Sequence, residues 1–277
     1  MKHPFASVNF CLAVALIVLA IPSASQVATG KSDFGSYGGG PFDVVDLGNL
    51  NTSFTIPIVH KNGRGLPFIY DLIYNSSVWY PVTSGSTTSW TPVTNWGWTS
   101  TWGGVSGYLT YSAPITYCYD GQGHPDGETV YYQNWVYHDP WSGKTHAFSG
   151  SMVIYSGGCT GTSVYSFTST ASDNSGLTLS VNNGTGTIIT KAGISIVPPT
   201  SAPTGPVSAP KTDYNGNQIT STTAGVFTDT LGTTALTISG ANPVNFSYTA
   251  PGGTATYAVL YGSILRGLSG WLLPRAA

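Results

Sequence analysis

Short runs of alternating apolar and polar residues, separated by turn signals, constrain this chain more than any other feature. Examples are NTSFTIPIV (51–59), TVYYQNWVYHD (129–139) and THAFSGSMVIY (145–155). A period of two is typical of strands, and no segment shows a helical repeat over ten residues. The pattern predicts an all-β fold in which antiparallel hairpins form a β-sandwich-like or sheet-rich N-terminal unit.

The composition agrees with the all-β prediction and argues against highly charged binding partners. Only 7% of the residues are charged, against about 25% in an average globular protein. Thr, Tyr, Val and Ile are residues that favour strands. The net charge of -2 gives no electrostatic reason to expect nucleic acid or an anionic membrane as a partner.

The N-terminus has the three-part pattern of a secretory signal. Lys2 is followed by an apolar run over residues 10–21, then by Pro22 and small residues. A membrane anchor is the alternative, but the run is well short of the roughly 20 residues that span a bilayer. We expect a signal peptide over 1–25, cleavage after Ser25, and a secreted or cell-surface protein with no membrane span after cleavage.

The number of cysteines left after signal cleavage bears on disulfide formation. Signal cleavage removes Cys11 and leaves Cys118 and Cys159. In an exported chain two remaining cysteines most simply form a disulfide, the alternative being two separate buried thiols. Neither their spacing nor their neighbours resemble a metal-binding or redox motif, so no metal site is predicted.

The remaining chain divides by composition. A Gly- and Ser-rich lead-in (26–41) precedes an N-terminal β domain (42–196). The segment VPPTSAPTGPVSAPK (197–211) carries five prolines, which are unsuited to a central strand, and is expected to connect that domain to a β-hairpin segment over 212–262. Residues 263–277 are expected to form a poorly ordered tail.

The segment YHDPWSGKTHAF (137–148) predicts a hairpin. Trp141, Ser142 and Gly143 would form its three-residue loop, with Gly143 in the left-handed conformation. That register pairs His138 with His146 on one face. Two imidazoles can share a metal, but zinc requires three or four ligands, so ordinary half-buried histidines are the favoured interpretation.

Three Asp-x-x-Gly units lie between strand-like runs. The Asp side chain can accept bonds from its own backbone two residues on, and Gly supplies the left-handed exit, so each unit predicts a turn. The six turn-forming residues are Asp173, Gly176, Asp213, Gly216, Asp229 and Gly232.

Two of these units carry a resemblance. TDYNGNQI (212–219) followed by GVFTDTLG (225–232) resembles the hairpin unit of the RHS/YD-repeat family, and residues 46–79 are similar to the entry region of secreted bacterial RHS-type proteins. The resemblance implies the start of an RHS-like β-spiral that encapsulates or displays a C-terminal cargo. It also implies a downstream RHS repeat region or a cell-surface component as partner. Only two units match well. We therefore expect the chain to be the N-terminal portion of a longer RHS-type protein, either truncated or diverged.

Catalytic groups are scarce. The chain after cleavage has one glutamate, Glu128, and ten aspartates, and no spacing singles out a glycosidase pair. No Gly-x-Ser-x-Gly elbow is present. YDGQGHPDGE (119–128) departs from the EF-hand pattern and is better explained as a polar hairpin loop. The sequence predicts a non-catalytic structural or interaction protein without a cofactor.

Two features suggest further roles, namely carbohydrate binding and self-association. Trp90, Trp96 and Trp98 lie in a Trp-rich segment (79–102) and could stack on sugar rings, which makes a carbohydrate-binding β-module the alternative function, although large aromatics also dominate cores. TATYAVLYG (254–262) alternates like a strand. If nothing follows it in the sheet, its unpaired edge favours self-association.

Overall fold

The computed structural model describes residues 36–40, 42–47, 50–63, 65–76, 79–84, 87–92, 97–98 and 104–260. Within these ranges the regular elements are strands in antiparallel pairs and none is a helix, so the all-β prediction is confirmed. None of these residues forms a helix long and apolar enough to cross a membrane. The expected signal peptide, the tail over 263–277 and Trp96 lie outside the described residues.

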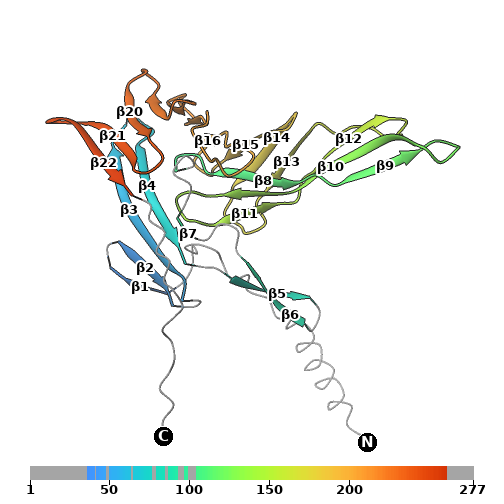
Figure 1. The fold of residues 1–277 in the computed structure, drawn as a ribbon, viewed down its shortest axis with the longest axis horizontal. Coiled ribbons are helices and arrows are strands. Elements are labelled where there is room, and N and C mark those ends of the chain that lie inside the picture. The colour runs from blue at the N-terminus through green and yellow to red at the C-terminus, as the bar shows by residue number, and fades with distance from the viewer. Residues whose placement is uncertain are drawn as a thin grey trace, which may run out of the picture.

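The first sheet is built around the long hairpin of β3 and β4, shown in blue and cyan in Figure 1. Its strand order is β1 (Tyr37–Gly39), β2 (Asp43–Asp46), β3 (Thr52–Lys61), β4 (Phe68–Asn75), β7 (Gly97–Trp98). A separate two-stranded hairpin is formed by β5 (Trp79–Ser84) and β6 (Thr87–Pro92).

The second sheet is organised by β10, which is 14 residues long. Its N-terminal half pairs with β9 and β12, and its C-terminal half pairs with β8 and β11. We call β9, β12 and residues 125–132 of β10 the arm, because they project away from the rest of the protein (Figure 1). The bounds are β8 (Tyr108–Ser112), β9 (Ile115–Tyr119), β10 (Pro125–His138), β11 (Thr145–Phe148) and β12 (Met152–Gly157).

The third sheet has ten strands, and each strand pairs with the next one along the chain. Short hairpins therefore build the sheet stepwise from one edge to the other. The strands are β13 (Ser166–Thr170), β14 (Thr178–Asn182), β15 (Thr185–Ile189), β16 (Ser195–Ile196), β17 (Lys211–Thr212), β18 (Gln218–Ser221), β19 (Val226–Asp229), β20 (Thr234–Ser239), β21 (Val244–Ala250) and β22 (Gly253–Val259).

The proline-rich segment lies inside this sheet's path and does not separate two units. Ser195 pairs with Thr212 and Ile196 pairs with Lys211, so β16 and β17 are neighbours. The N–H of Val197 also donates to the carbonyl of Pro210. The prolines fall in the loop between these pairs, where no ladder amide is needed. The expected connector is thus a loop between adjacent strands of one sheet.

Two apolar cores lie between the ten-stranded sheet and the two five-stranded sheets. In the first, Tyr70 of β4 packs against Phe227 and Phe246, with ring centroids 5.8 and 5.6 Å apart. In the second, Trp135 of β10 packs in one cluster with Leu179 and Ile188. Each such fully buried side chain contributes about 1.5–3 kcal/mol. The ten-stranded sheet therefore packs against both the first and the second sheet, which gives this part of the fold a sandwich-like architecture.

Candidate functional site

The hairpin between β10 and β11 differs by one residue from the expected register. Tyr137 pairs with His146 and His138 pairs with Thr145, so the predicted pairing of His138 with His146 is wrong. The Asp139 carboxylate accepts bonds from the N–H of Trp141 and the hydroxyl of Ser142. Because of these bonds the turn begins at Asp139, one residue earlier than expected. The loop therefore has four residues and includes Pro140. Since neighbouring residues of a strand alternate sides, the two histidines face opposite ways.

His138 lies in an apolar environment. Its ring stacks on Tyr108 with centroids 4.1 Å apart, and its Nε2 lies 3.0 Å from the hydroxyl of Thr110. Burial lowers the pKa of His138 to about 4. The imidazole is therefore neutral at physiological pH and serves as a packing residue.

His146 lies between two carboxylates. Its Nδ1 is 2.6 Å from Oδ2 of Asp173, and its Nε2 is 3.9 Å from Oδ2 of Asp139. Burial by itself lowers the pKa of His146, but Asp139 and Asp173 more than offset this, and the net pKa is raised. Burial raises the pKa of both carboxyl groups, but their hydrogen bonds more than offset it, and the pKa of each is lowered. For Asp139 these are the bonds from His146, Ser142 and Trp141. For Asp173 they are the bonds from Ser175, followed by the charge and bond of His146.

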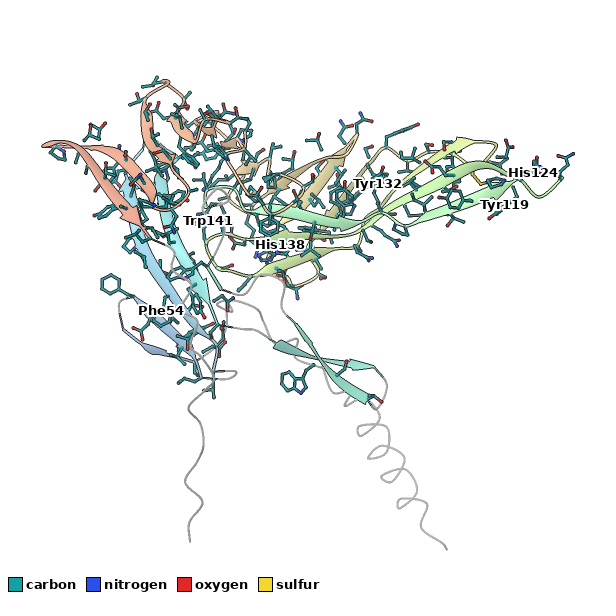
Figure 2. All side chains as sticks on the ribbon, viewed as in Figure 1. Phe54, Tyr119, His124, Tyr132, His138 and Trp141 are labelled. Carbon is teal, nitrogen blue, oxygen red and sulfur yellow. A yellow bond between two sulfur atoms is a disulfide. The ribbon has the colours of Figure 1, made fainter. Side chains whose placement is uncertain are left out.

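A lysine completes this group from the ten-stranded sheet. Nζ of Lys211 lies 4.2 Å from the ring centroid of Trp141, which is labelled in Figure 2. Burial lowers the pKa of Lys211 to about 8, and the charge of Asp139 works against that change. We call Asp139, His146, Asp173 and Lys211 the junction cluster, because its members come from both the second and the third sheet.

The junction cluster contains the residue types of a hydrolase triad but is connected differently. The hydroxyl of Ser142 donates to Asp139, not to His146. The raised pKa of His146 favours the protonated imidazole, which cannot accept a proton from a nucleophile. Nowhere in the described part of the chain do three or more His, Cys, Asp or Glu side chains form a group able to hold a metal. The geometry supports charge pairing between the sheets.

Two of the three Asp-x-x-Gly units form the same turn. Oδ1 of Asp213 accepts the N–H groups of Asn215 and Asn217 at 2.9 and 2.8 Å. Oδ1 of Asp229 accepts the N–H groups of the residues two and four positions on, at the same two distances. Gly216 and Gly232 have φ angles of 83° and 76°, the left-handed conformation that glycine tolerates.

The third unit belongs to a longer loop. The N–H of Ala171 donates to the carbonyl of Leu177, which encloses Asp173 and Gly176 in the same loop. Oδ1 of Asp173 accepts the N–H of Ser175, while its Oδ2 faces His146. Asp173 therefore forms a turn and a contact to β11 at once, a second role that the motif did not predict.

Sequence reasoning missed other copies of this turn. Asp120 accepts the N–H groups of Gln122 and His124 in the same way, so DGQG (120–123) is a further Asp-x-x-Gly turn. At residues 222–226 the hydroxyl of Thr222 accepts the corresponding amides. The first of these was readable as a motif. The second could not be recognised from the Asp-x-x-Gly motif, because threonine takes the place of aspartate.

Of the tryptophans expected to stack on glycans, the two that the structure describes, Trp90 and Trp98, do not form one row. Trp90 of β6 is 67% exposed, and Trp98 of β7 is 48% exposed. The Trp98 ring also packs edge-on against Tyr74, with centroids 5.3 Å apart. Because β6 and β7 belong to different sheets, these two side chains are not held on a common strand face.

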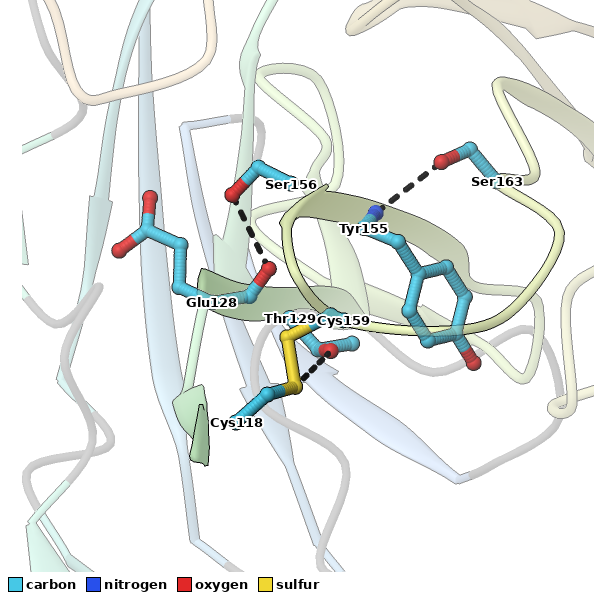
Figure 3. Close-up of a disulfide and its surroundings, with 7 residues drawn as sticks. All are labelled: Cys118, Glu128, Thr129, Tyr155, Ser156, Cys159 and Ser163. Atoms are coloured by element: carbon cyan, nitrogen blue, oxygen red, sulfur yellow. Dashed lines mark hydrogen bonds between the residues drawn. A yellow bond between two sulfur atoms is a disulfide. The ribbon is translucent and has the colours of Figure 1, made fainter. Parts of the chain in front are cut away.

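Cys118 of β9 and Cys159, which follows β12, form a disulfide with Cα atoms 5.3 Å apart (Figure 3). The hydroxyl of Thr129 lies 3.9 Å from Sγ of Cys118. Ser163 accepts the N–H of Tyr155, so the segment after β12 is held against the arm at two points. The disulfide thus stabilises the outer part of the arm.

Comparison of the whole chain with protein-family models, curated proteins and solved structures finds no match in any of the three.

Proposed function

We propose that this protein is a non-catalytic, exported structural component of the bacterial surface or cell wall, with its ten-stranded sheet forming the start of an RHS-like shell. The observation that carries the proposal is the strand order, in which ten successive strands pair in chain order. Stepwise growth through Asp-x-x-Gly hairpins is the geometry that the family resemblance implies. The charge-paired junction cluster, which lacks a free base, supports a structural role.

The partner in this proposal joins the sheet at β22. That strand pairs with β21, and no other described strand lies beside it. Its residues, GTATYAV, contain no charge and no proline, the features by which proteins block edge-to-edge pairing. A downstream RHS repeat region, a cell-surface component or a second copy of the chain would satisfy this edge.

The register shows which amides are open. Only Pro251 and Gly252 separate the paired residues Ala250 and Gly253, so this closing pair exchanges backbone bonds. Bonded and non-bonded pairs alternate along an antiparallel ladder. The amides of Thr254, Thr256 and Ala258 therefore point to the outer edge of β22.

Sedimentation velocity over a range of concentrations tests this proposal. We expect the purified protein to associate, and Thr256→Pro to abolish association because proline removes an outer amide without breaking the backbone bonds to β21. Thr256→Val keeps the amide but, like the proline variant, loses the hydroxyl bond to Ser247, and it is therefore the matched control. A protein that stays monomeric at all concentrations, or a Thr256→Pro variant that associates normally, would contradict the edge-pairing role.

Carbohydrate binding is a second candidate because of one observation, the 67% exposure of the Trp90 ring. A ring exposed to this extent can stack on a sugar. Soluble plant and bacterial glycans should then quench or shift the tryptophan fluorescence, and Trp90→Ala should remove the change. An unchanged spectrum with every glycan would leave this candidate without support.

A further inference from the structure

The two faces of the arm differ. On one face, residues 158–163 cross the sheet and are tied to it by the disulfide between Cys118 and Cys159. A Cβ atom on Gly161 would lie only 2.4 Å from the ring of Tyr155, which shows how closely this segment covers that ring. We call the opposite side of the arm the open face.

The open face carries aromatic and aliphatic side chains in rows. Ile115 pairs with Val130, which pairs with Ile154, and such cross-strand neighbours share a face. Tyr117 pairs with Glu128 in the next row. Their exposure is high, at 49% for Ile115, 54% for Tyr117 and 63% for Tyr119. Figure 2 shows Tyr119 near the tip of the arm, well away from both cores.

The arm contains acidic side chains and one histidine, His124, but no lysine or arginine. Residues 108–138 contain Asp120, Asp126 and Glu128, and no lysine or arginine. Residues 147–165, which include β12 and the covering segment, contain no charged residue. Asp120 is paired with His124, and Asp126 lies against Gly158 of the covering segment, so Glu128 is the carboxylate beside the exposed tyrosine rings of the open face. Glu128 lies directly across from Tyr117 on the open face.

We propose that the open face is a docking surface for an extended, lysine- or arginine-rich polypeptide segment. Ammonium and guanidinium groups are attracted to the faces of tyrosine rings and to carboxylates, and the aliphatic stems of these side chains pack on apolar surface. An uncharged glycan would use the rings but not the carboxylates. The negative charge of Glu128, with no lysine or arginine in residues 108–138, therefore favours a cationic partner.

β9 also suits an extended partner. Among the described strands it pairs only with β10, so its other edge is open to the solvent beside the tyrosines. A segment lying along this edge can bond to the backbone while its alternate side chains reach Tyr117 and Tyr119. This surface is remote from β22, so it is independent of the sheet-continuation role proposed above.

Fluorescence anisotropy with a labelled oligolysine peptide tests the proposal on the purified protein. We expect binding that weakens as sodium chloride is raised, because salt screens exposed charges. Replacing Tyr117 and Tyr119 together by Ala should weaken binding roughly tenfold, the effect of losing two exposed cation–π contacts. Glu128→Gln should weaken it as well.

Matched variants separate binding from folding. Tyr117→Phe keeps the ring and should bind as the wild type does. Tyr214→Ala removes a ring that is 79% exposed on the ten-stranded sheet and should have no effect. Thermal melts of each variant show whether the fold is intact.

Two outcomes would overturn the proposal. Oligolysine binding that is absent, or that is unchanged in the Tyr117 and Tyr119 variants, would show that the open face is not a cationic docking surface. Binding of uncharged cello-oligosaccharides, lost in the same variants, with no binding of oligolysine would assign the face to a glycan. Neither outcome affects the sedimentation test of β22.

Discussion

Nδ1 of His146 lies 2.6 Å from Oδ2 of Asp173 and joins β11 to the loop before β14, although 27 residues separate the two in the chain. This contact connects the second and third sheets through a charge. Asp139 lies on the other side of the ring at 3.9 Å. The strength of the connection therefore depends on the protonation of a single imidazole.

The first prediction concerns this imidazole. The raised pKa of His146 means that its contribution to stability is fully present below about pH 6.5 and is lost as the pH rises through the folded-state pKa. The groups that face it are Asp139, Asp173 and the ring of Tyr137, and Lys211 lies close to Asp139. Urea unfolding at a series of pH values should show this loss in the wild type.

His146→Gln should remove that pH dependence and destabilise the protein most at low pH. His124→Gln, at the exposed tip of the arm, is the control and should behave as the wild type does. A stability difference between the wild type and His146→Gln that rises between pH 6.5 and pH 8 would mean that burial, and not the two carboxylates, dominates the pKa of His146.

The second prediction concerns His138 and has the opposite sign. Its folded pKa of about 4 is below its ordinary value of 6.5, so the unfolded chain binds the proton more tightly between these values. Stability should therefore fall as the pH drops from 6.5 to 4, by on the order of 3 kcal/mol for this group. The melting temperature of His138→Gln should depend less steeply on pH over that interval. Parallel curves for the two proteins would rule out His138 as the origin.

The third prediction tests the Asp-x-x-Gly turns. Gly216→Ala should destabilise the protein by about 1–2 kcal/mol, because alanine is disfavoured at a φ of 83° while its Cβ would meet no other atom. Gly252→Ala is the matched control, since that position is equally open and has an ordinary φ. Urea titration measures both. Equal effects at the two positions would show that the left-handed conformation is not what Gly216 supplies.

The fourth prediction concerns the disulfide. Replacing Cys118 and Cys159 together by Ser should destabilise the protein by about 4 kcal/mol, the chain-entropy value for a loop closed over 41 positions. Hydrogen exchange should speed up mainly in β9 and β12. Exchange in β19–β21, which lie in the other core, should change little. Uniformly faster exchange across all three sheets would mean that the arm and the body unfold together.

Several features were predictable because their physical cause is local. Alternation along each run indicated strands, since the period of two is a property of the extended backbone itself. The turn at Asp213 followed from a side chain that bonds amides two and four residues on. Cys118 and Cys159 were the only two cysteines left after the expected signal cleavage, which made them the expected pair.

The register of the hairpin at Asp139 could not be predicted from the turn residues alone. Glycine at position 143 allows either a three- or a four-residue loop. The choice depended on the Asp139 carboxylate, whose bonds to Trp141 and Ser142 shift the register by one and separate His138 from His146. One misplaced residue changes the face of every later side chain in a strand.

By itself the sequence determined that this chain forms strands, where most of them turn, and that its surface is nearly without charge. Only the tertiary structure decided that β16 and β17 pair across the proline-rich loop, that one sheet covers both cores, and that Asp139, His146, Asp173 and Lys211 meet. The physical reason is the range of the interactions. Strand and turn preferences act over a few residues, whereas these pairings are selected by the burial of apolar surface between segments far apart in the chain.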